Sequence, residues 1–87
     1  MNIKILGSGC ARCHQLEKTT REVVKELSID ATIEEVKDIQ KITEYPILTT
    51  PGLVINEELV CAGRVPTKAE LTHLIADALT KEDKTKR

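Results

Sequence analysis

Aromatic residues are almost absent from this 87-residue sequence, in which Tyr45 is the only one and neither Trp nor Phe occurs. Single-stranded nucleic acid is bound largely by stacking its bases on aromatic side chains, so we do not expect a partner of this class. The formal net charge is only −1, from 13 basic and 14 acidic residues. Without an excess of positive charge, the protein is not expected to be attracted to nucleic acid or to an anionic membrane.

Long hydrophobic runs are also lacking, since no segment approaches the roughly 20 apolar residues that a transmembrane helix needs. The N-terminus does not have the basic, apolar and small-residue order of a signal peptide. We therefore expect a cytoplasmic protein with no membrane segment. The length and the globular composition, 40% hydrophobic and 31% charged, favour a single domain at residues 1–80. The highly charged residues 81–87 are expected to form a tail, and we expect the protein to be a monomer.

The hydrophobic pattern predicts an alternation of strands and helices. In the short second helix, Ile39, Ile42 and Tyr45 should share one side. The predicted elements are a strand at 2–6, a helix at 11–28, a strand at 31–37, a short helix capped by Asp38 and stopped by Pro46, a hairpin of strands at 53–55 and 59–61, and a helix that follows a capping box at 66–70. The first strand–helix–strand unit should be parallel and right-handed. The expected fold class is therefore α/β, a four-stranded mixed sheet with helices on both faces.

Two cysteines stand where the first strand passes into the first helix. Cys10 and Cys13 are separated by Ala11 and Arg12. Unpaired backbone N–H groups, the positive end of the helix dipole and the charge of Arg12 all favour a thiolate at this position. Two intervening residues allow the second sulfur to reach the first across one helical turn. We predict that Cys10 is the exposed, attacking thiolate and that Cys13 is the more buried, resolving thiol.

A second element is the dipeptide Thr50-Pro51, which opens a strand after a turn. A cis bond there would present the backbone groups of Thr50 to an extended peptide, which could pair with them in β fashion. An ordinary trans proline at a strand edge is the alternative interpretation.

Taken together, the segments 7–13, 50–54 and 62–66 resemble the thioredoxin/glutaredoxin superfamily, and in particular its small prokaryotic proteins with a redox-active disulfide. The resemblance covers residues 2 to about 79. It implies a thioredoxin-like fold, a cis Pro51 beside the cysteine pair, and dithiol–disulfide exchange as the activity. The redox group would be the disulfide itself, with no organic cofactor and no metal. The partners would be protein disulfides and an unidentified reductase.

The same resemblance implies that the substrate contacts come from Ala11, Arg12, Thr50, Pro51 and Gly63. The sequence departs from the superfamily in two places. Thioredoxins have a Trp directly before the first cysteine, where this chain has Gly9. Glutaredoxins have two glycines and acidic residues for glutathione, where this chain has only one glycine, Gly63, followed by Arg64. Neither thioredoxin reductase nor glutathione is therefore assumed as the electron source.

Other interpretations of the cysteines remain open. With His14, the cysteine pair also fits the C-x-x-C-H attachment motif of c-type haem, for which His73 or Met1 would have to be the second axial ligand. The pair could instead hold a soft metal or metalloid, which is the alternative function, or the domain could be a redox-inactive interaction module. Cys61 is read as a buried hydrophobic residue of a strand or as a third redox or metal thiol. His14 and His73 are otherwise expected on helix surfaces.

Overall fold

The computed structural model describes residues 1–7, 11–47 and 49–85, the last four of them by their backbone alone. Strands and helices alternate along the chain in the predicted order. The elements are β1 (Asn2–Leu6), α1 (Ala11–Glu26), β2 (Thr32–Val36), α2 (Ile39–Ile42), β3 (Gly52–Ile55), β4 (Glu58–Ala62) and α3 (Lys68–Thr85).

The four strands form one mixed sheet in the order β2-β1-β3-β4. β1 and β2 are parallel, whereas β3 is antiparallel to both of its neighbours, β1 and β4. α1 joins the two parallel strands, as a crossover helix must. The prediction of an α/β fold with a four-stranded mixed sheet is confirmed.

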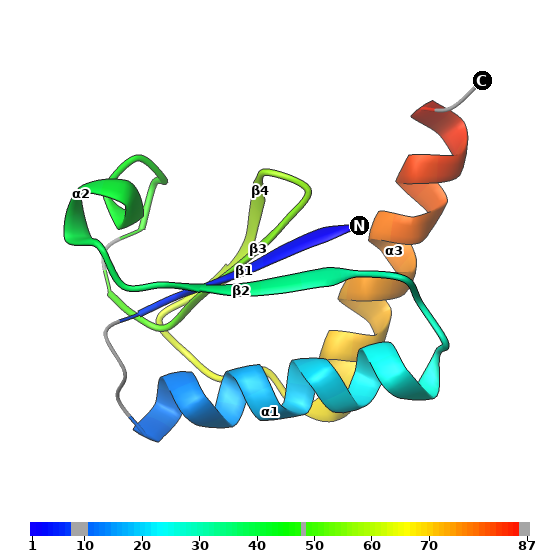
Figure 1. Ribbon diagram of the computed structural model, residues 1–87, viewed down its shortest axis with the longest axis horizontal. Coiled ribbons are helices and arrows are strands. Elements are labelled where there is room, and N and C mark those ends of the chain that lie inside the picture. Colours follow the sequence, from blue (N-terminus) through cyan, green and yellow to red (C-terminus); the bar gives the residue numbers. More distant parts are fainter. Residues whose placement is uncertain (8–10, 48, 86–87) are drawn as a thin grey trace.

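Helices cover both faces of this sheet (Figure 1). On one face α1 and α3 pack over alternate residues of the two central strands, and the largest fully buried residues of this cluster are Ile3, Ile5, Leu16, Leu53, Ile55, Leu71 and Ile75. On the other face a smaller cluster joins α2 to the sheet through Leu6, Val36, Ile42 and Val54. Because strand side chains alternate between the faces, both faces of β1 and β3 become buried. Tyr45 packs on the α2 face, against this second cluster.

α1 ends two residues before the predicted end. The residue that ends it has a backbone conformation that the sequence pattern does not predict. Ser28 has a φ of 54° in the left-handed region, where glycine is usual. The N–H of Ser28 donates to the carbonyl of Lys25 (3.1 Å), and that of Ile29 donates to the carbonyl of Val24 (3.0 Å). These two bonds form a Schellman motif. Leu27, which lies within the predicted helix but beyond the end of α1, is 39% exposed.

The other two helices also differ from expectation. α2 spans a single turn, and Ile39 at its start is 71% exposed whereas Ile42 at its end is buried. Its predicted N-cap is confirmed, since the Asp38 carboxylate accepts from the N–H of Gln40 (2.9 Å). α3 continues to Thr85, into the segment expected to be a tail, because the chain there has no Gly or Pro to stop it.

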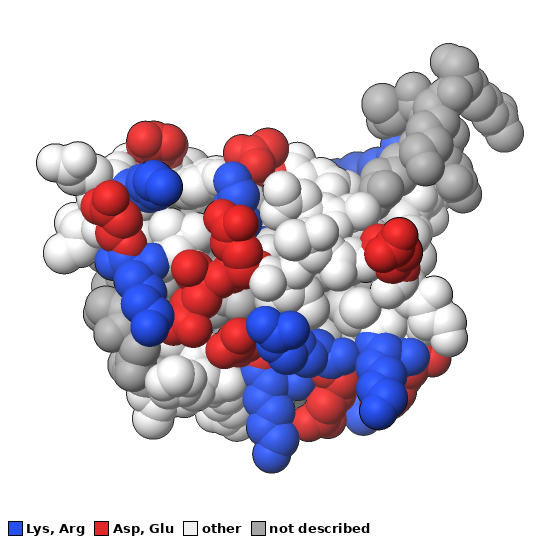
Figure 2. Space-filling view, in the orientation of Figure 1, with Lys and Arg blue, Asp and Glu red and all other residues white. Residues whose placement is uncertain are grey.

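The face shown in Figure 2 carries Lys and Arg side chains intermixed with Asp and Glu side chains. Oppositely charged side chains form ion pairs, such as Arg21 with the half-buried Glu17 on α1 (3.0 Å). Among the described residues, none of the helices is both long enough and apolar enough to cross a lipid bilayer.

Candidate active site

The sheet register brings three distant chain segments together at one edge. Leu6, the last residue of β1, pairs with Gly52, the first residue of β3, and Gly52 pairs in turn with Ala62 at the end of β4. The residues next to these positions, Gly7 and Gly63, must therefore lie at the same edge as the start of β3. The site is formed there, beside the start of α1.

Cys13 lies in the first turn of α1 and is only 1% exposed. It packs directly against Gly7, because a Cβ built on Gly7 would collide with the Cys13 sulfur and approach its Cβ to 3.2 Å. The same position lies 4.0 Å from the Cβ of Thr50. A side chain at residue 7 would thus displace the thiol, and the glycine is what allows Cys13 to lie at the end of β1.

The loop after β4 closes the other side of this edge. Gly63 has a φ of 79°, in the left-handed region that favours glycine, and its N–H donates to the Pro51 carbonyl (2.9 Å). A Cβ on Gly63 would lie 2.6 Å from the Thr49 hydroxyl oxygen. The loop after β4 is therefore fitted closely to residues 49–51.

Arg12 connects this loop to α1. Its side chain is exposed, and its Nη2 donates a hydrogen bond to the carbonyl of Gly63 (2.9 Å). Gly63 is thus hydrogen-bonded on both sides: its carbonyl accepts from Arg12 at the start of α1, and its N–H donates to Pro51 just before β3. As a result, Arg12 is tied to the backbone of the site and adds a permanent positive charge beside the first turn of the helix.

The structure brings together most of the residues that the sequence singled out. Arg12, Cys13, Thr50, Pro51 and Gly63 surround one edge of the sheet, with Pro51 buried and Thr50 exposed, and Ala11 is exposed at the start of α1. The peptide bond between Thr50 and Pro51 is cis. Cys10, the predicted attacking thiolate, lies outside the described residues.

No role of its own was predicted for Gly7 from the sequence, so the contact of this residue with the thiol was missed. A signal was available, because a glycine at the end of a strand permits the close approach of a neighbouring group. Which group approaches depends on the path by which the chain enters α1.

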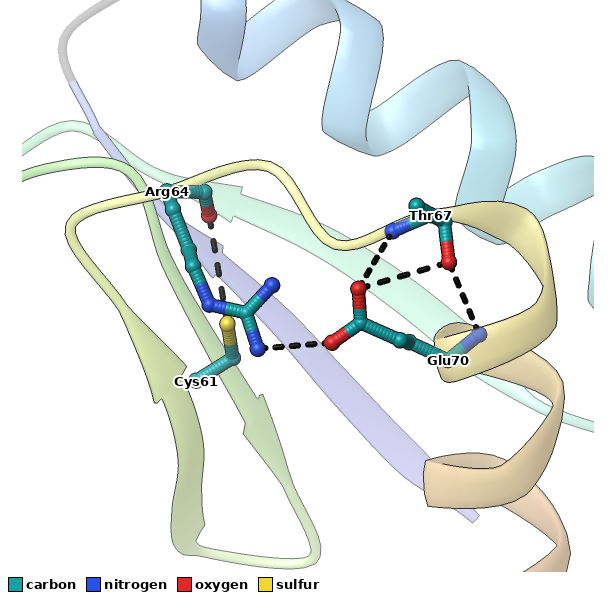
Figure 3. Close-up of polar contacts among 4 residues, drawn as sticks. All are labelled: Cys61, Arg64, Thr67 and Glu70. Atoms are coloured by element: carbon teal, nitrogen blue, oxygen red, sulfur yellow. Dashed lines mark hydrogen bonds and ion pairs between the residues drawn. The ribbon is translucent and has the colours of Figure 1, made fainter.

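Cys61 lies on β4 and is a free, half-buried thiol. It packs against the cluster under α1 and α3, and its sulfur contacts the carbonyl of Arg64 at 3.9 Å (Figure 3). The strand position agrees with the interpretation of Cys61 as a hydrophobic strand residue, but its side chain is half-buried rather than fully buried. Within the part of the chain that the structure describes, the hydrogen-bond partner of the Cys61 sulfur is this Arg64 carbonyl, in the loop that follows the strand.

The loop between Cys61 and α3 is held by a charged capping box (Figure 3). The Thr67 hydroxyl accepts from the N–H of Glu70 (3.2 Å), and the Glu70 carboxylate accepts from the N–H of Thr67 (3.3 Å), as predicted. Glu70 also pairs with Arg64 at 2.7 Å. The hydrogen bond from Arg64, followed by the one from the Thr67 backbone, lowers the pKa of Glu70 from 4.5 to about 2.

The sheet order, the helix that begins beside its edge, and the buried thiol packed against the strand end define a thioredoxin-like fold. Residues 1–76 match the family model described as a thioredoxin domain, and the chain belongs to that family. It is 45% identical over 76 residues to a thioredoxin of Methanothermobacter thermautotrophicus, which covers 87% of this chain and 99% of that one. It is also 36% identical over 69 residues to a thioredoxin of Methanocaldococcus jannaschii, with 79% of each chain covered.

Proposed function

We propose that this protein is a thiol–disulfide oxidoreductase that exchanges two electrons with disulfides of other proteins through Cys10 and Cys13. The observation that carries the proposal is the placement of Cys13. A thiol in the first turn of a helix, 1% exposed and packed against Gly7 at a sheet edge, can react with a neighbouring sulfur in its own chain but not with a large partner. Membership of the thioredoxin family supports the reaction class.

In the proposed reaction, the Cys10 thiolate attacks one sulfur of a substrate disulfide. A mixed disulfide forms, and the first substrate thiolate leaves. The Cys13 thiolate then attacks the sulfur of Cys10, which releases the second substrate thiolate and leaves a Cys10–Cys13 disulfide. The substrate gains two electrons, the protein loses two, and solvent protons neutralise the released thiolates. A separate reductase of the cell returns the protein to the dithiol form.

The other residues of the site support this chemistry from fixed positions. The first-turn N–H groups of α1 and the charge of Arg12 favour the thiolate form of a cysteine at the helix start. Thr50 is exposed beside Cys13, where a substrate backbone can reach it. We propose Ala11, Arg12, Thr50, Pro51 and Gly63 as the surface that the substrate contacts.

The test uses single cysteine variants and a protein disulfide such as that of insulin. Cys10→Ser should abolish reduction of the substrate, whereas Cys13→Ser should accumulate a mixed disulfide that mass spectrometry detects on Cys10. Cys61→Ser is the matched control and should retain the wild-type rate, since Cys61 lies on β4 with its sulfur against the Arg64 carbonyl.

Full activity of Cys10→Ser would contradict the proposal, as would the absence of any trapped species in Cys13→Ser. Elemental analysis of protein purified without oxygen provides a further check. A soft metal bound stoichiometrically by the two thiols would favour the alternative function instead.

A further inference from the structure

A second group of potential ligands lies on the flank of α1 that faces β2, and its geometry points to a site for a divalent transition-metal ion. His14 and Glu17 are three residues apart on α1, and Glu35 belongs to β2. One ligand atom from each residue lies within 4.8 Å of one from each of the others. We propose that these three side chains bind one such ion, at a site that uses none of the cysteines.

The position of Glu35 follows from the alternation of β2. Ile33, two residues earlier, packs against the cluster under α1, so Glu35 occupies the same face of the strand. On α1, residues three apart share a side of the helix. The helix thus presents an imidazole and a carboxylate to the strand, and the strand presents a second carboxylate to the helix.

The Glu35 carboxylate is incompletely satisfied in its present contacts. The side chains of Glu17 and Glu35 are only 22% and 18% exposed. Glu35 Oε1 is buried and has no hydrogen-bond partner among the described residues, its one cation contact being Lys37 Nζ at 3.9 Å. Glu17 accepts hydrogen bonds from Arg21 at 3.0 and 3.3 Å. Two carboxylates held close together repel each other, and an ion bound between them would offset this repulsion and give Glu35 Oε1 a partner.

The ligand set indicates the class of ion. One imidazole nitrogen and two carboxylate oxygens suit borderline divalent ions such as Zn²⁺ or Co²⁺, whereas Ca²⁺ and Mg²⁺ prefer oxygen ligands alone and soft ions prefer sulfur. Ligand atoms around a tetrahedral zinc lie about 3.3 Å apart, given zinc–ligand distances of about 2.0–2.1 Å. The three ligand atoms, now within 4.8 Å of one another, would have to move closer together to bind such an ion. Side-chain rotations would suffice, because all three side chains are exposed or half-buried. Water would complete the coordination.

The test is titration of the full-length protein with Co²⁺, followed by calorimetry and by visible absorption. The wild type should bind one ion with a spectrum of nitrogen and oxygen ligands. His14→Ala and Glu35→Gln should each weaken binding at least tenfold. Glu34→Gln, which removes an exposed charge from the same strand, is the matched control and should change the affinity less than twofold.

Arg21→Gln is expected to change the metal affinity in the opposite direction, which a cluster without a metal-binding role would not do. Removing the guanidinium that competes for Glu17 should tighten binding, and weaker binding would exclude Glu17 as a ligand and overturn the three-residue site. Thiolate-to-cobalt charge-transfer bands that persist in His14→Ala would place the ion on the cysteines and also overturn the proposal. The proposed metal site uses no cysteine, so Cys10→Ser should bind Co²⁺ like the wild type even though it loses disulfide exchange. The two proposals can therefore fail independently.

Discussion

The contact between Gly7 and Cys13 can be tested by adding one methyl group. In Gly7→Ala the new Cβ would overlap the buried sulfur, and overpacking of this kind costs about 1–3 kcal/mol. The φ of Gly7 is not in the left-handed region, so alanine loses nothing in the folded backbone and gains about 0.4–1 kcal/mol by restricting the unfolded chain. The net expectation is a loss of about 1–2 kcal/mol of unfolding free energy. For a domain of this size that lowers Tm by roughly 4–16 °C.

A double-mutant cycle isolates the collision. In Gly7→Ala/Cys13→Ala the sulfur is gone and only the 3.2 Å approach to the Cβ remains, so most of the overpacking cost should disappear. Urea unfolding should then show a double variant about 1–2 kcal/mol more stable than the sum of the single effects predicts. Cys61→Ala replaces Cys13→Ala in the control cycle and should add to Gly7→Ala without coupling.

The same substitution should affect the proposed chemistry. Displacement of the Cys13 sulfur would slow its attack on the mixed disulfide, so Gly7→Ala should accumulate a smaller amount of the species that Cys13→Ser traps. Additivity of Gly7→Ala and Cys13→Ala within about 0.5 kcal/mol would refute the contact. Wild-type resolution kinetics in a destabilised Gly7→Ala variant would refute the dependence of the reaction on this packing.

Two further predictions concern the loop after β4. Glu70 has a pKa lowered to about 2 by Arg64, so its contribution to stability is present above about pH 4.5 and is lost as the pH falls toward 2. Glu70→Gln should therefore flatten the fall of Tm across that window, and an unchanged pH profile would contradict the pairing. Arg12→Met removes the hydrogen bond to the Gly63 carbonyl and should cost less than about 1 kcal/mol of stability while slowing reduction of a protein disulfide. An unchanged rate would show that Arg12 has no part in substrate contact.

The fold could be predicted from local patterns because its elements have strong local signals. The capping box at Thr67 and Glu70 and the cap at Asp38 are side-chain bonds within a few residues, so the sequence contains both partners. Where an element lacks such a signal, prediction was weaker. Ser28 adopts a left-handed conformation at the end of α1 without being glycine, and the predicted helix consequently extended too far.

The site was only partly predictable, because its residues meet through strand pairing. The proximity of Gly7, Pro51 and Gly63 depends on the register of β1, β3 and β4, and a shift by one residue would reverse the faces of every side chain involved. The hydrogen bond from Arg12 to Gly63 spans 51 residues of sequence. No local pattern indicates such a bond.

By itself, the sequence determined the order of the elements, the position of Cys13 in the first turn of a helix and the absence of an aromatic surface, since each depends on neighbouring residues and composition. The tertiary structure alone decided that Gly7 touches the Cys13 sulfur and that Glu35 lies beneath the flank of α1. Both contacts join residues from different elements. They form because the buried core between the sheet and the helices fixes the positions of these elements relative to one another.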